Sequence, residues 1–439
     1  MTGNAPLSVH AAETLLFFTL MQLSVIVLAG RAGGALARRL GQTAAVGEIV
    51  IGILLGPSLL GLLAPGVFHY VFHSASGTPL QILSQIGLIL LMFQIGLEFD
   101  FAHLSERSNR RAALWIGLAS MLAPFAFGLG FGAASASALS PQSGLVTSAL
   151  FIATAFSITA LPILGRILVD FDLHRTPLGV IAISAAAFND VIGWLLLALV
   201  TALAMSHFEP ATFGLQVLLV LGFALLWLFI VRPLMHRVIR HSQAGGADLS
   251  PNLLGVVLTA IFVSAMTTYQ IGIFAIFGGF MMGVILHDQP RLVQAWKAQI
   301  SPFVLVFFLP IFFTYTGLRT DIGGLSSASL WGWCALLITL ATLGKFGGAY
   351  LAARWRGMSR PQAGVMGALM NTRALMELIV INVGYDLGAI SHNVFTMLVL
   401  MAIFSTIITA PLLRLWLPRM VFSPPAVPIC ADSAKAGSA

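Results

Sequence analysis

Long apolar stretches, separated by short polar segments, follow one another along almost the whole chain. A helix needs about 20 predominantly apolar residues to cross the hydrocarbon core of a bilayer. The polar segment 267–272 is the weakest boundary, since it is equally consistent with a kink inside one long helix. The pattern predicts an all-α integral membrane protein with about thirteen transmembrane helices, at residues 13–35, 44–63, 80–100, 112–136, 144–170, 177–204, 212–234, 252–271, 273–287, 301–320, 330–353, 363–387 and 393–416.

The composition excludes an ordinary soluble protein. Hydrophobic residues make up 58% of the chain and charged residues only 8%, against roughly 25% charged residues in soluble domains. Cys334 and Cys430 stand far apart, so neither a disulfide framework nor a metal-ligand cluster is indicated. No basic residue precedes the first apolar stretch, and we therefore expect no cleaved signal peptide. The net charge of +7 comes from cations dispersed among loops, which argues against a nucleic-acid partner.

The distribution of these cations predicts the orientation in the membrane. Every second loop between the predicted helices is rich in Lys and Arg. The loops between these contain essentially one cation, Arg319 at a helix edge. Because cytoplasmic loops are enriched in Lys and Arg, the N-terminus is expected outside and the C-terminus in the cytoplasm, with an odd number of helices. The cations on the cytoplasmic side are Arg38, Arg39, Arg107, Arg110, Arg111, Arg166, Arg175, Arg232, Arg237, Arg240, Arg291, Lys297, Arg354, Arg356, Arg360, Arg414 and Arg419.

Two pairs of short motifs recur seven helices apart. The third predicted helix ends in IGLEFD (95–100) and the tenth in TGLRTD (316–321), while IGILLG (51–56) and MGVILH (282–287) lie in the second and ninth. An odd offset gives the two halves opposite orientations. Inverted repeats of this kind are typical of secondary transporters, whose binding site lies near the membrane midplane. The alternative is a chance match within low-complexity apolar sequence.

The polar segments are short, so residues 1–424 are expected to form one transmembrane domain and residues 425–439 a short disordered cytoplasmic tail. There is no glycine-rich dinucleotide motif after a strand and no Walker A sequence. We therefore expect no cofactor, no nucleotide and no enzyme activity. Energy for transport would come from an ion gradient.

Asp190 is the most informative ionisable residue. It lies midway along the predicted helix 177–204, where a charge costs at least ~2.5 to 3.5 kcal/mol and is a functional-site hypothesis by default. A carboxylate can hold a proton or a cation but not both, and the preceding Asn189 adds an amide oxygen suited to a small cation. The alternative is a structural carboxylate that only pairs with a lysine. The other ionisable residues well inside predicted helices are Glu48, Lys345, Arg373 and Glu377.

Two predicted helices carry polar interruptions. The helix at 144–170 contains Ser157, Thr159 and Pro162, and the helix at 363–387 contains residues 371–373. Broken helices are tolerated in a bilayer only where the freed backbone meets protein or lines a cavity, and their ends coordinate ions in several transporters. If the two helices cross beside Asp190, Arg373 and Glu377 could compensate their dipole ends. The alternative is a local i,i+4 pair, which is compatible with the first interpretation.

The remaining charges have weaker assignments. Small residues flank Lys345, so its long side chain could reach inward and pair with Asp190. The alternative is that the side chain snorkels to the cytoplasmic surface. Glu48, near the inner face, is a candidate for the ion entrance. Histidines form no metal-binding spacing. The acids at helix ends, which we expect to be caps or loop contacts, are Glu98, Asp100 and Asp321.

Six motifs resemble those of the cation:proton antiporter-2 family. The similarity extends over about residues 48–386 and is greatest to plant-type cation/proton exchangers and their bacterial relatives, with Kef-type potassium efflux systems more distant. The motifs, in chain order, are GEIVIGILLGPSLLG, MFQIGLEFDF, ATAFSITALPILGRIL, AAAFNDVIGWLLLAL, FLPIFFTYTGLRTDI and NTRALMELIVINVGYDLG.

The resemblance implies a sodium/proton antiporter-like fold, in which thirteen helices form an inverted repeat and the discontinuous fifth and twelfth cross. It implies a homodimer, with core helices at about 80–204 and 301–416 moving like an elevator against scaffold helices at about 13–63 and 212–287. It places ion binding and proton coupling on Asp190, Asn189, Ser157 and Thr159, and structural charges on Lys345, Arg373 and Glu377. The implied cargo is K+ or Na+ and H+.

Three departures from the family pattern bear on function. Asn189 stands where electrogenic relatives have a second Asp, which favours an electroneutral exchange. The cytoplasmic regulatory domain of Kef and plant members does not occur in this sequence, so gating by nucleotide or glutathione is not expected. Ala374 replaces a glycine of the family motif NTRGLMEL and would stiffen the crossing, which puts the rate or selectivity in question.

The sequence thus predicts an antiporter of the inner (plasma) membrane that exchanges K+ or Na+ for H+ at Asp190. Two alternatives remain open. A Kef-like gated potassium channel or leak would use the same polar interior without obligatory exchange. A transport-inactive membrane sensor would have no need for so costly a carboxylate.

Overall fold

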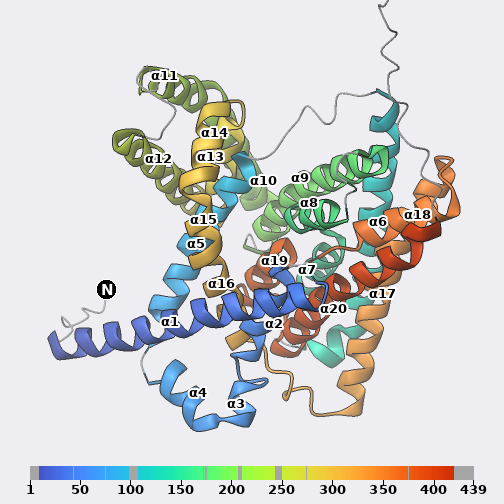
Figure 1. Ribbon diagram of the computed structural model, residues 1–439, viewed down its shortest axis with the longest axis horizontal. Helices are drawn as coiled ribbons and strands as arrows, with labels where there is room; N and C mark the ends of the chain where they lie inside the picture. Colours follow the sequence, from blue (N-terminus) through green and yellow to red (C-terminus); the bar gives the residue numbers. More distant parts are fainter. Residues whose placement is uncertain are drawn as a thin grey trace, which may run out of the picture.

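The computed structural model describes residues 9–419 except 43, 75, 98–106, 142, 172, 174–175, 206–209, 243–249, 273 and 374. The secondary structure of this part of the chain is entirely helical (Figure 1). Nine helical stretches within it are long and apolar enough to cross a membrane by themselves. The fold class expected from the apolar pattern is therefore confirmed, whereas the number of crossings and their orientation stay predictions.

Every predicted apolar stretch coincides with one helix or with consecutive helices. These are α1 (Val9–Arg39), α2 (Ala44–Leu54) with α3 (Leu60–Leu63), α5 (Thr78–Leu97), α6 (Arg107–Leu139), α7 (Leu145–Ser157) with α8 (Leu161–Asp170), α9 (Pro177–Met205), α10 (Pro210–Leu226) with α11 (Arg232–Ser242), α12 (Pro251–Gln270), α13 (Ala275–Leu286), α15 (Ser301–Phe303) with α16 (Leu309–Leu318), α17 (Ala328–Trp355), α18 (Arg360–Met370) with α19 (Leu375–Asp386), and α20 (His392–Trp416). Short π-helical segments join α10 to α11 and α15 to α16. The sequence did not predict the separate short helices α4 (Pro65–Phe72) and α14 (Pro290–Gln299).

The uncertain boundary at 267–272 is a true turn between two helices. Helix α12 ends at Gln270 and α13 begins at Ala275. Gly272 has φ of +82°, a conformation that side chains disfavour. The two helices then pack against each other, and the Ser264 hydroxyl donates to the carbonyl oxygen of Gly278 at 2.7 Å. The alternative of one kinked helix is wrong.

The helix contacts support the inverted repeat. Helix α2 packs on α16, and α5 packs on α13. The repeated motifs make α2 the counterpart of α13 and α5 the counterpart of α16. The two contacts are therefore repeats of one contact. The glycines of the repeated motifs make both contacts. A Cβ on Gly317 would lie 2.1 Å from the Gly52 carbonyl oxygen, and a Cβ on Gly283 would lie 2.8 Å from the Gly96 Cα. Small residues permit such close backbone approach in membranes.

Packing divides the described helices into two groups. Helices α6 to α9 and α17 to α20 pack mainly on one another, and we call them the core group. Helices α1, α2, α5, α12, α13 and α16 pack mainly on one another, and we call them the scaffold group. This grouping differs from the expected one, which placed α5 and α16 among the core helices. Figure 1 shows α6, α17 and α18 on the right and α5, α12 and α13 on the left.

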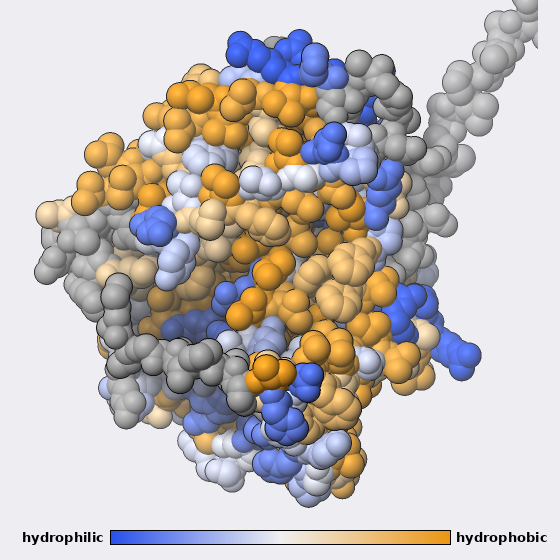
Figure 2. Space-filling model, turned by 90° about the vertical axis from the view of Figure 1, so that its left-hand side faces the viewer, coloured by the Kyte–Doolittle hydropathy of each residue, from blue (hydrophilic) through white to orange (hydrophobic). Residues whose placement is uncertain are grey.

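The outer surface is apolar, as a bilayer requires. Leu218, Leu225 and Phe229, on α10 and the π-helical segment after it, are exposed. Figure 2 shows broad hydrophobic areas on the face that it displays. Buried charged side chains lie instead where the two broken helices of the core group meet.

Candidate ion-binding site

The two broken helices meet at their breaks. Helix α7 ends at Ser157, the chain is extended at Ile158, and α8 begins at Leu161. Helix α18 ends at Met370 and α19 begins at Leu375. The backbone N–H of Ala160 in the first break donates to the carbonyl oxygen of Thr372 in the second, at 3.2 Å. The conditional prediction that the two interruptions lie together is confirmed.

Asp190 lies in the middle of α9, beside this crossing, with 1% of its surface exposed. Neither carboxylate oxygen completes a hydrogen bond with any described residue. The backbone N–H of Leu161 at the start of α8 faces the carboxylate, and the ammonium group of Lys345 is near enough to interact with it electrostatically. A helix N-terminus favours a negative charge. The carboxylate therefore has electrostatic support while its oxygens remain available to a proton or a cation.

Asn189 fixes α9 to two neighbours. Its Nδ2 donates to the Ser120 hydroxyl of α6 at 2.9 Å and to the Thr159 hydroxyl at 3.2 Å. Its Oδ1 has no hydrogen-bond partner among the described residues. The amide nitrogen of Asn189 thus links α9 to Ser120 and Thr159. Its amide oxygen, next to Asp190, has no described partner and is available as a cation ligand.

Ser157 and Thr159 take different positions at the first break. The Ser157 hydroxyl donates back to the carbonyl oxygen of Ala153 at 2.7 Å, and the Ser157 carbonyl oxygen accepts from the Lys345 ammonium group. The Thr159 hydroxyl accepts a hydrogen bond from Asn189. Ser157 and Thr159 are both fully buried. The break therefore presents two hydroxyl oxygens and freed backbone groups beside α9.

Lys345 points inward. Its side chain is 0% exposed, which excludes the alternative that it snorkels to the cytoplasmic surface. Helices α17 and α6 approach closely around it, since a Cβ on Gly348 would lie 2.5 Å from the Ala119 carbonyl oxygen. Its ammonium group donates a hydrogen bond to the Ser157 carbonyl oxygen, and within the described chain it forms no ion pair with Asp190 in this conformation.

Arg373 and Glu377 form a fully buried ion pair with an Nη1–Oε1 distance of 3.1 Å. Arg373 also donates to the carbonyl oxygens of Ala155 at 3.1 Å and Ala341 at 3.0 Å, and its own carbonyl accepts from the Thr406 hydroxyl at 2.7 Å. The predicted i,i+4 pair exists. The same arginine joins α7, α17, α20 and the break before α19, so the two interpretations of this pair hold together.

The ionisable side chains around the crossing balance. Lys345 and Arg373 supply two positive charges, and Asp190 and Glu377 supply two negative charges when all four are ionised. The cations lie on carbonyl oxygens at the C-terminal end of α7, and Glu377 lies in the first turn of α19. Each charge opposes the nearest helix dipole. The cluster is neutral when Asp190 is empty and carries one positive charge when it holds a proton or a monovalent cation.

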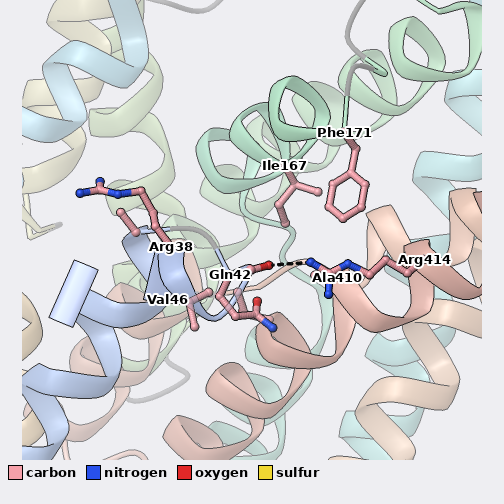
Figure 3. Close-up of a pocket in the computed structure, with 10 residues that line it drawn as sticks. Arg38, Gln42, Val46, Ile167, Phe171, Ala410 and Arg414 are labelled. Carbon is pink, nitrogen blue, oxygen red and sulfur yellow. Dashed lines mark hydrogen bonds between the residues drawn. The ribbon is translucent and has the colours of Figure 1, made fainter. Parts of the chain in front are cut away.

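A cavity of about 430 Å³ approaches the crossing from the end of the bundle that contains Arg414. It lies between α20, α8 and the turn after α1, and Thr406, the partner of the Arg373 carbonyl, lines it. Figure 3 shows Arg414 pointing across this cavity to the turn, where its guanidinium donates to the Gly41 carbonyl oxygen at 3.2 Å.

A smaller cavity of about 170 Å³ approaches from the opposite end. It extends between α5, α16 and α19, from Asp386 to Ile379, and so covers two turns of α19 leading toward the second break. Asp190 lines neither cavity. In this conformation the carboxylate is occluded, with a cavity toward each end of the bundle.

The other predicted residues lie outside this cluster. Glu48 is buried on α2, where its Oε1 would lie 3.3 Å from a Cβ on Gly34 of α1, and it is one turn from Ala44, which lines the larger cavity. Asp321 lies in the turn after α16, beside Gly324. Across the described ranges no group of three or more His, Cys, Asp and Glu side chains could hold a metal ion. Glu98, Asp100 and Ala374 lie outside the described residues.

Two features of the structure have no signal in the sequence. Ser120 holds Asn189, but a single hydroxyl inside an apolar stretch gives no signal. Arg319 was noted only as an isolated cation, yet its guanidinium forms an ion pair with Asp386 at 2.6 Å. The partner lies 67 residues away, and only their shared position at one end of the bundle connects them.

Known proteins are similar to this chain over most of its length. Residues 23–417 match the family model described as "Sodium/hydrogen exchanger, transmembrane". The Na(+)/H(+) antiporter NhaS4 of Synechocystis sp. is 39% identical over 402 residues, which are 90% of this chain and 96% of that protein. Cation/H(+) antiporter 17 of Arabidopsis thaliana is 38% identical over 413 residues, 93% of this chain but only 49% of that protein, so this chain spans about half of its length.

A solved structure shares the fold. The sodium proton antiporter MjNhaP1 from Methanocaldococcus jannaschii superposes with a TM-score of 0.63 at 15% identity, covering 92% of this chain and 98% of that one. At that identity the similarity concerns the fold alone. The family model and the Synechocystis relative show that the chain belongs to the transmembrane sodium/hydrogen exchanger family.

Proposed function

We propose that this protein is a secondary active antiporter that exchanges K+ or Na+ for H+, with Asp190 as the group that carries both. The observation that carries the proposal is a fully buried carboxylate with no completed hydrogen bond among the described residues, placed where two broken helices meet. The relatives' names, which specify Na(+)/H(+) and cation/H(+) antiport, support the proposed exchange.

Exchange follows from competition for one carboxylate. Ionised Asp190, together with the free Asn189 Oδ1 and the Thr159 hydroxyl, supplies the oxygen ligands that hard monovalent cations prefer. A proton on Asp190 removes the charge that attracts the cation, so the two cargoes bind alternately. Ser157 contributes its hydroxyl at the edge of the same break.

The charge balance favours an electroneutral exchange. The cluster around Asp190 has the same net charge with a proton as with a monovalent cation, so both loaded forms cross the membrane field equally. Asn189 is essential to this balance, because a second carboxylate there would add a negative charge. Lys345, Arg373 and Glu377 hold the broken helix ends and are not themselves carriers.

Alternating access would come from movement of the core group against the scaffold group. The core group contains Asp190 and both broken helices, and the two cavities lie on opposite sides of the crossing at the boundary between the groups. We place α5 and α16 with the scaffold, because they pack on α13 and α2. Glu48, one turn from Ala44 of the larger cavity, would attract cations to it.

We place the protein in the inner (plasma) membrane as a homodimer, with the N-terminus outside and the C-terminus in the cytoplasm. The arginines at the end of the bundle that contains the larger cavity support this orientation, since cytoplasmic ends are basic. In this orientation the larger cavity faces the cytoplasm and the cavity at Asp386 faces outside. The apolar exposed face of α10 is available to lipid or to a second copy.

The test is proton movement in proteoliposomes that contain a pH dye. An imposed K+ or Na+ gradient should move protons, and Asp190→Asn should abolish that movement. Glu13→Gln, which removes an exposed carboxylate of α1, is the matched control and should retain it. Clamping the membrane potential should change the rate little.

The other outcomes identify the alternatives. Cation current without proton movement would support the Kef-like channel. Absence of flux with every alkali cation, in a protein that is folded and correctly inserted, would support the sensor. Proton movement that survives in Asp190→Asn would show that another group carries the cargo.

A further inference from the structure

A polar cluster lies at the end of the bundle opposite Arg414. Arg319, which caps α16, forms an ion pair with Asp386, the last residue of α19, with an Nη1–Oδ1 distance of 2.6 Å. The same guanidinium donates to Asn382 Oδ1 at 3.3 Å and to the Tyr315 hydroxyl. It also stacks over the Tyr315 ring, 4.3 Å from the centroid. The arginine is thus held in one orientation.

This cluster joins the two helix groups. Arg319 and Tyr315 belong to the scaffold, since α16 packs on α2 and α5, whereas Asp386 and Asn382 belong to the core, since α19 packs on α7 and α20. Asn382 adds a second link through a 2.9 Å hydrogen bond from its Nδ2 to the Thr316 hydroxyl. The backbones of α16 and α19 otherwise make few close approaches. Polar side chains therefore hold these two helices together.

The cluster also closes a path toward the ion site. Tyr315, Asn382 and Asp386 all line the cavity of about 170 Å³ that follows α19 toward the crossing. Arg319 and Tyr315 line a second cavity, of about 270 Å³, on the other side of the cluster. The ion pair thus lies between two spaces. Separation of α16 from α19 would join them and lengthen the path toward Asp190.

We propose that the Arg319–Asp386 pair is a latch between the scaffold and core groups, which closes the access path at this end and opens once in each transport cycle. The proposal rests on the proposed antiport for its role in the cycle, but the closure itself can be measured without transport. The side chains of Arg319 and Asp386 are 20% and 32% exposed, so water reaches the pair and it can reopen. Loss of such a partly exposed pair should shift the closed-to-open ratio on the order of two- to fivefold.

Ser84 gives a direct readout of closure. It is 1% exposed and lines the cavity on α5. We would introduce Ser84→Cys into a chain carrying Cys334→Ala and Cys430→Ser, and measure its rate of labelling by a membrane-impermeant maleimide added on the side of Asp386. Arg319→Gln and Asp386→Asn should each raise the labelling rate on the order of two- to fivefold.

The chain offers a matched control. Arg232 and Asp288 form an ion pair of the same 2.6 Å length and similar exposure, 38% and 35%, but α11 and the end of α13 lie on the same side of the group boundary. Arg232→Gln should leave the Ser84→Cys labelling rate unchanged. A rate that is unaffected by Arg319→Gln and Asp386→Asn, or raised equally by Arg232→Gln, would overturn the proposal.

Cross-linking tests whether the latch must open for transport. In the same cysteine-free background, Arg319→Cys/Asp386→Cys would be bridged by a short bifunctional thiosulfonate reagent. Cation-driven proton flux should fall to background and return on reduction, while each single cysteine variant keeps its flux after treatment. Full flux in the bridged protein refutes the latch. Absence of flux in the unmodified protein refutes the proposed antiport instead and leaves the labelling result to decide whether the latch closes this end.

Discussion

Glu377→Gln should destabilise the protein strongly, because it leaves Arg373 buried without its counter-charge. Both side chains are 0% exposed and 3.1 Å apart. The substitution keeps the size of the side chain and removes only its charge. Arg373 would retain its hydrogen bonds to Ala155 and Ala341, which satisfy donors but do not neutralise the guanidinium.

The size of the effect follows from the burial of the pair. Removing one partner of a buried ion pair costs about 3 to 5 kcal/mol, whereas an exposed pair contributes about 0 to 1 kcal/mol. For a chain of 439 residues this corresponds to a fall in the melting temperature on the order of 3 to 5 °C. Removing both charges, in Arg373→Gln/Glu377→Gln, should cost less than the sum of the two single substitutions.

The assay is the loss of monodisperse protein in detergent after heating, at one fixed heating rate for all variants. Arg232→Gln breaks the exposed pair with Asp288 and serves as the control, with an expected shift of about 1 °C at most. The reasoning is refuted if Glu377→Gln melts within that margin of the unmodified protein. It is also refuted if the two single losses simply add in the double variant, because the charges would then not be coupled.

Three further outcomes follow from the geometry. Asn189→Asp should make proton flux dependent on membrane potential by adding a second carboxylate beside Asp190; flux that stays independent of the clamped potential would contradict the charge argument. Gly317→Val should prevent the packing of α2 on α16, because its Cβ would lie 2.1 Å from the Gly52 carbonyl oxygen. The amount of monodisperse protein should drop to near zero. Gly332→Val, at an open position of α17, is the control and should give as much monodisperse protein as the unmodified chain. Partial burial raises the pKa of Asp288, but the hydrogen bond from Arg232 and the positive charges around it, which include His236 at 3.1 Å, outweigh it and lower the pKa below its ordinary value. A lowered pKa means that the pair contributes above the ordinary pKa range of Asp and loses this contribution on acidification, so Arg232→Gln should lower the melting temperature at pH 8 and leave it unchanged at pH 3.

The apolar pattern was sufficient to place every long helix, because the bilayer imposes one length and one hydrophobic requirement on each span. The same constraint made Asp190, Lys345, Arg373 and Glu377 conspicuous, since a charge in an apolar stretch has no local explanation. The motifs at 95–100 and 316–321 indicated the repeat, and the glycines within them proved to be the contact points.

Only the tertiary structure decided how these residues combine. It brought the two breaks together through Ala160 and Thr372, turned Lys345 inward onto Ser157, and gave Asn189 its partner Ser120. It also paired Arg319 with Asp386 across the boundary between the two helix groups. Apolar patterning determines how deep a residue lies in the membrane, because every span meets the same solvent. It does not determine which faces of two spans meet, because lipid is as apolar as the side chains and only packing and hydrogen bonding select the partner.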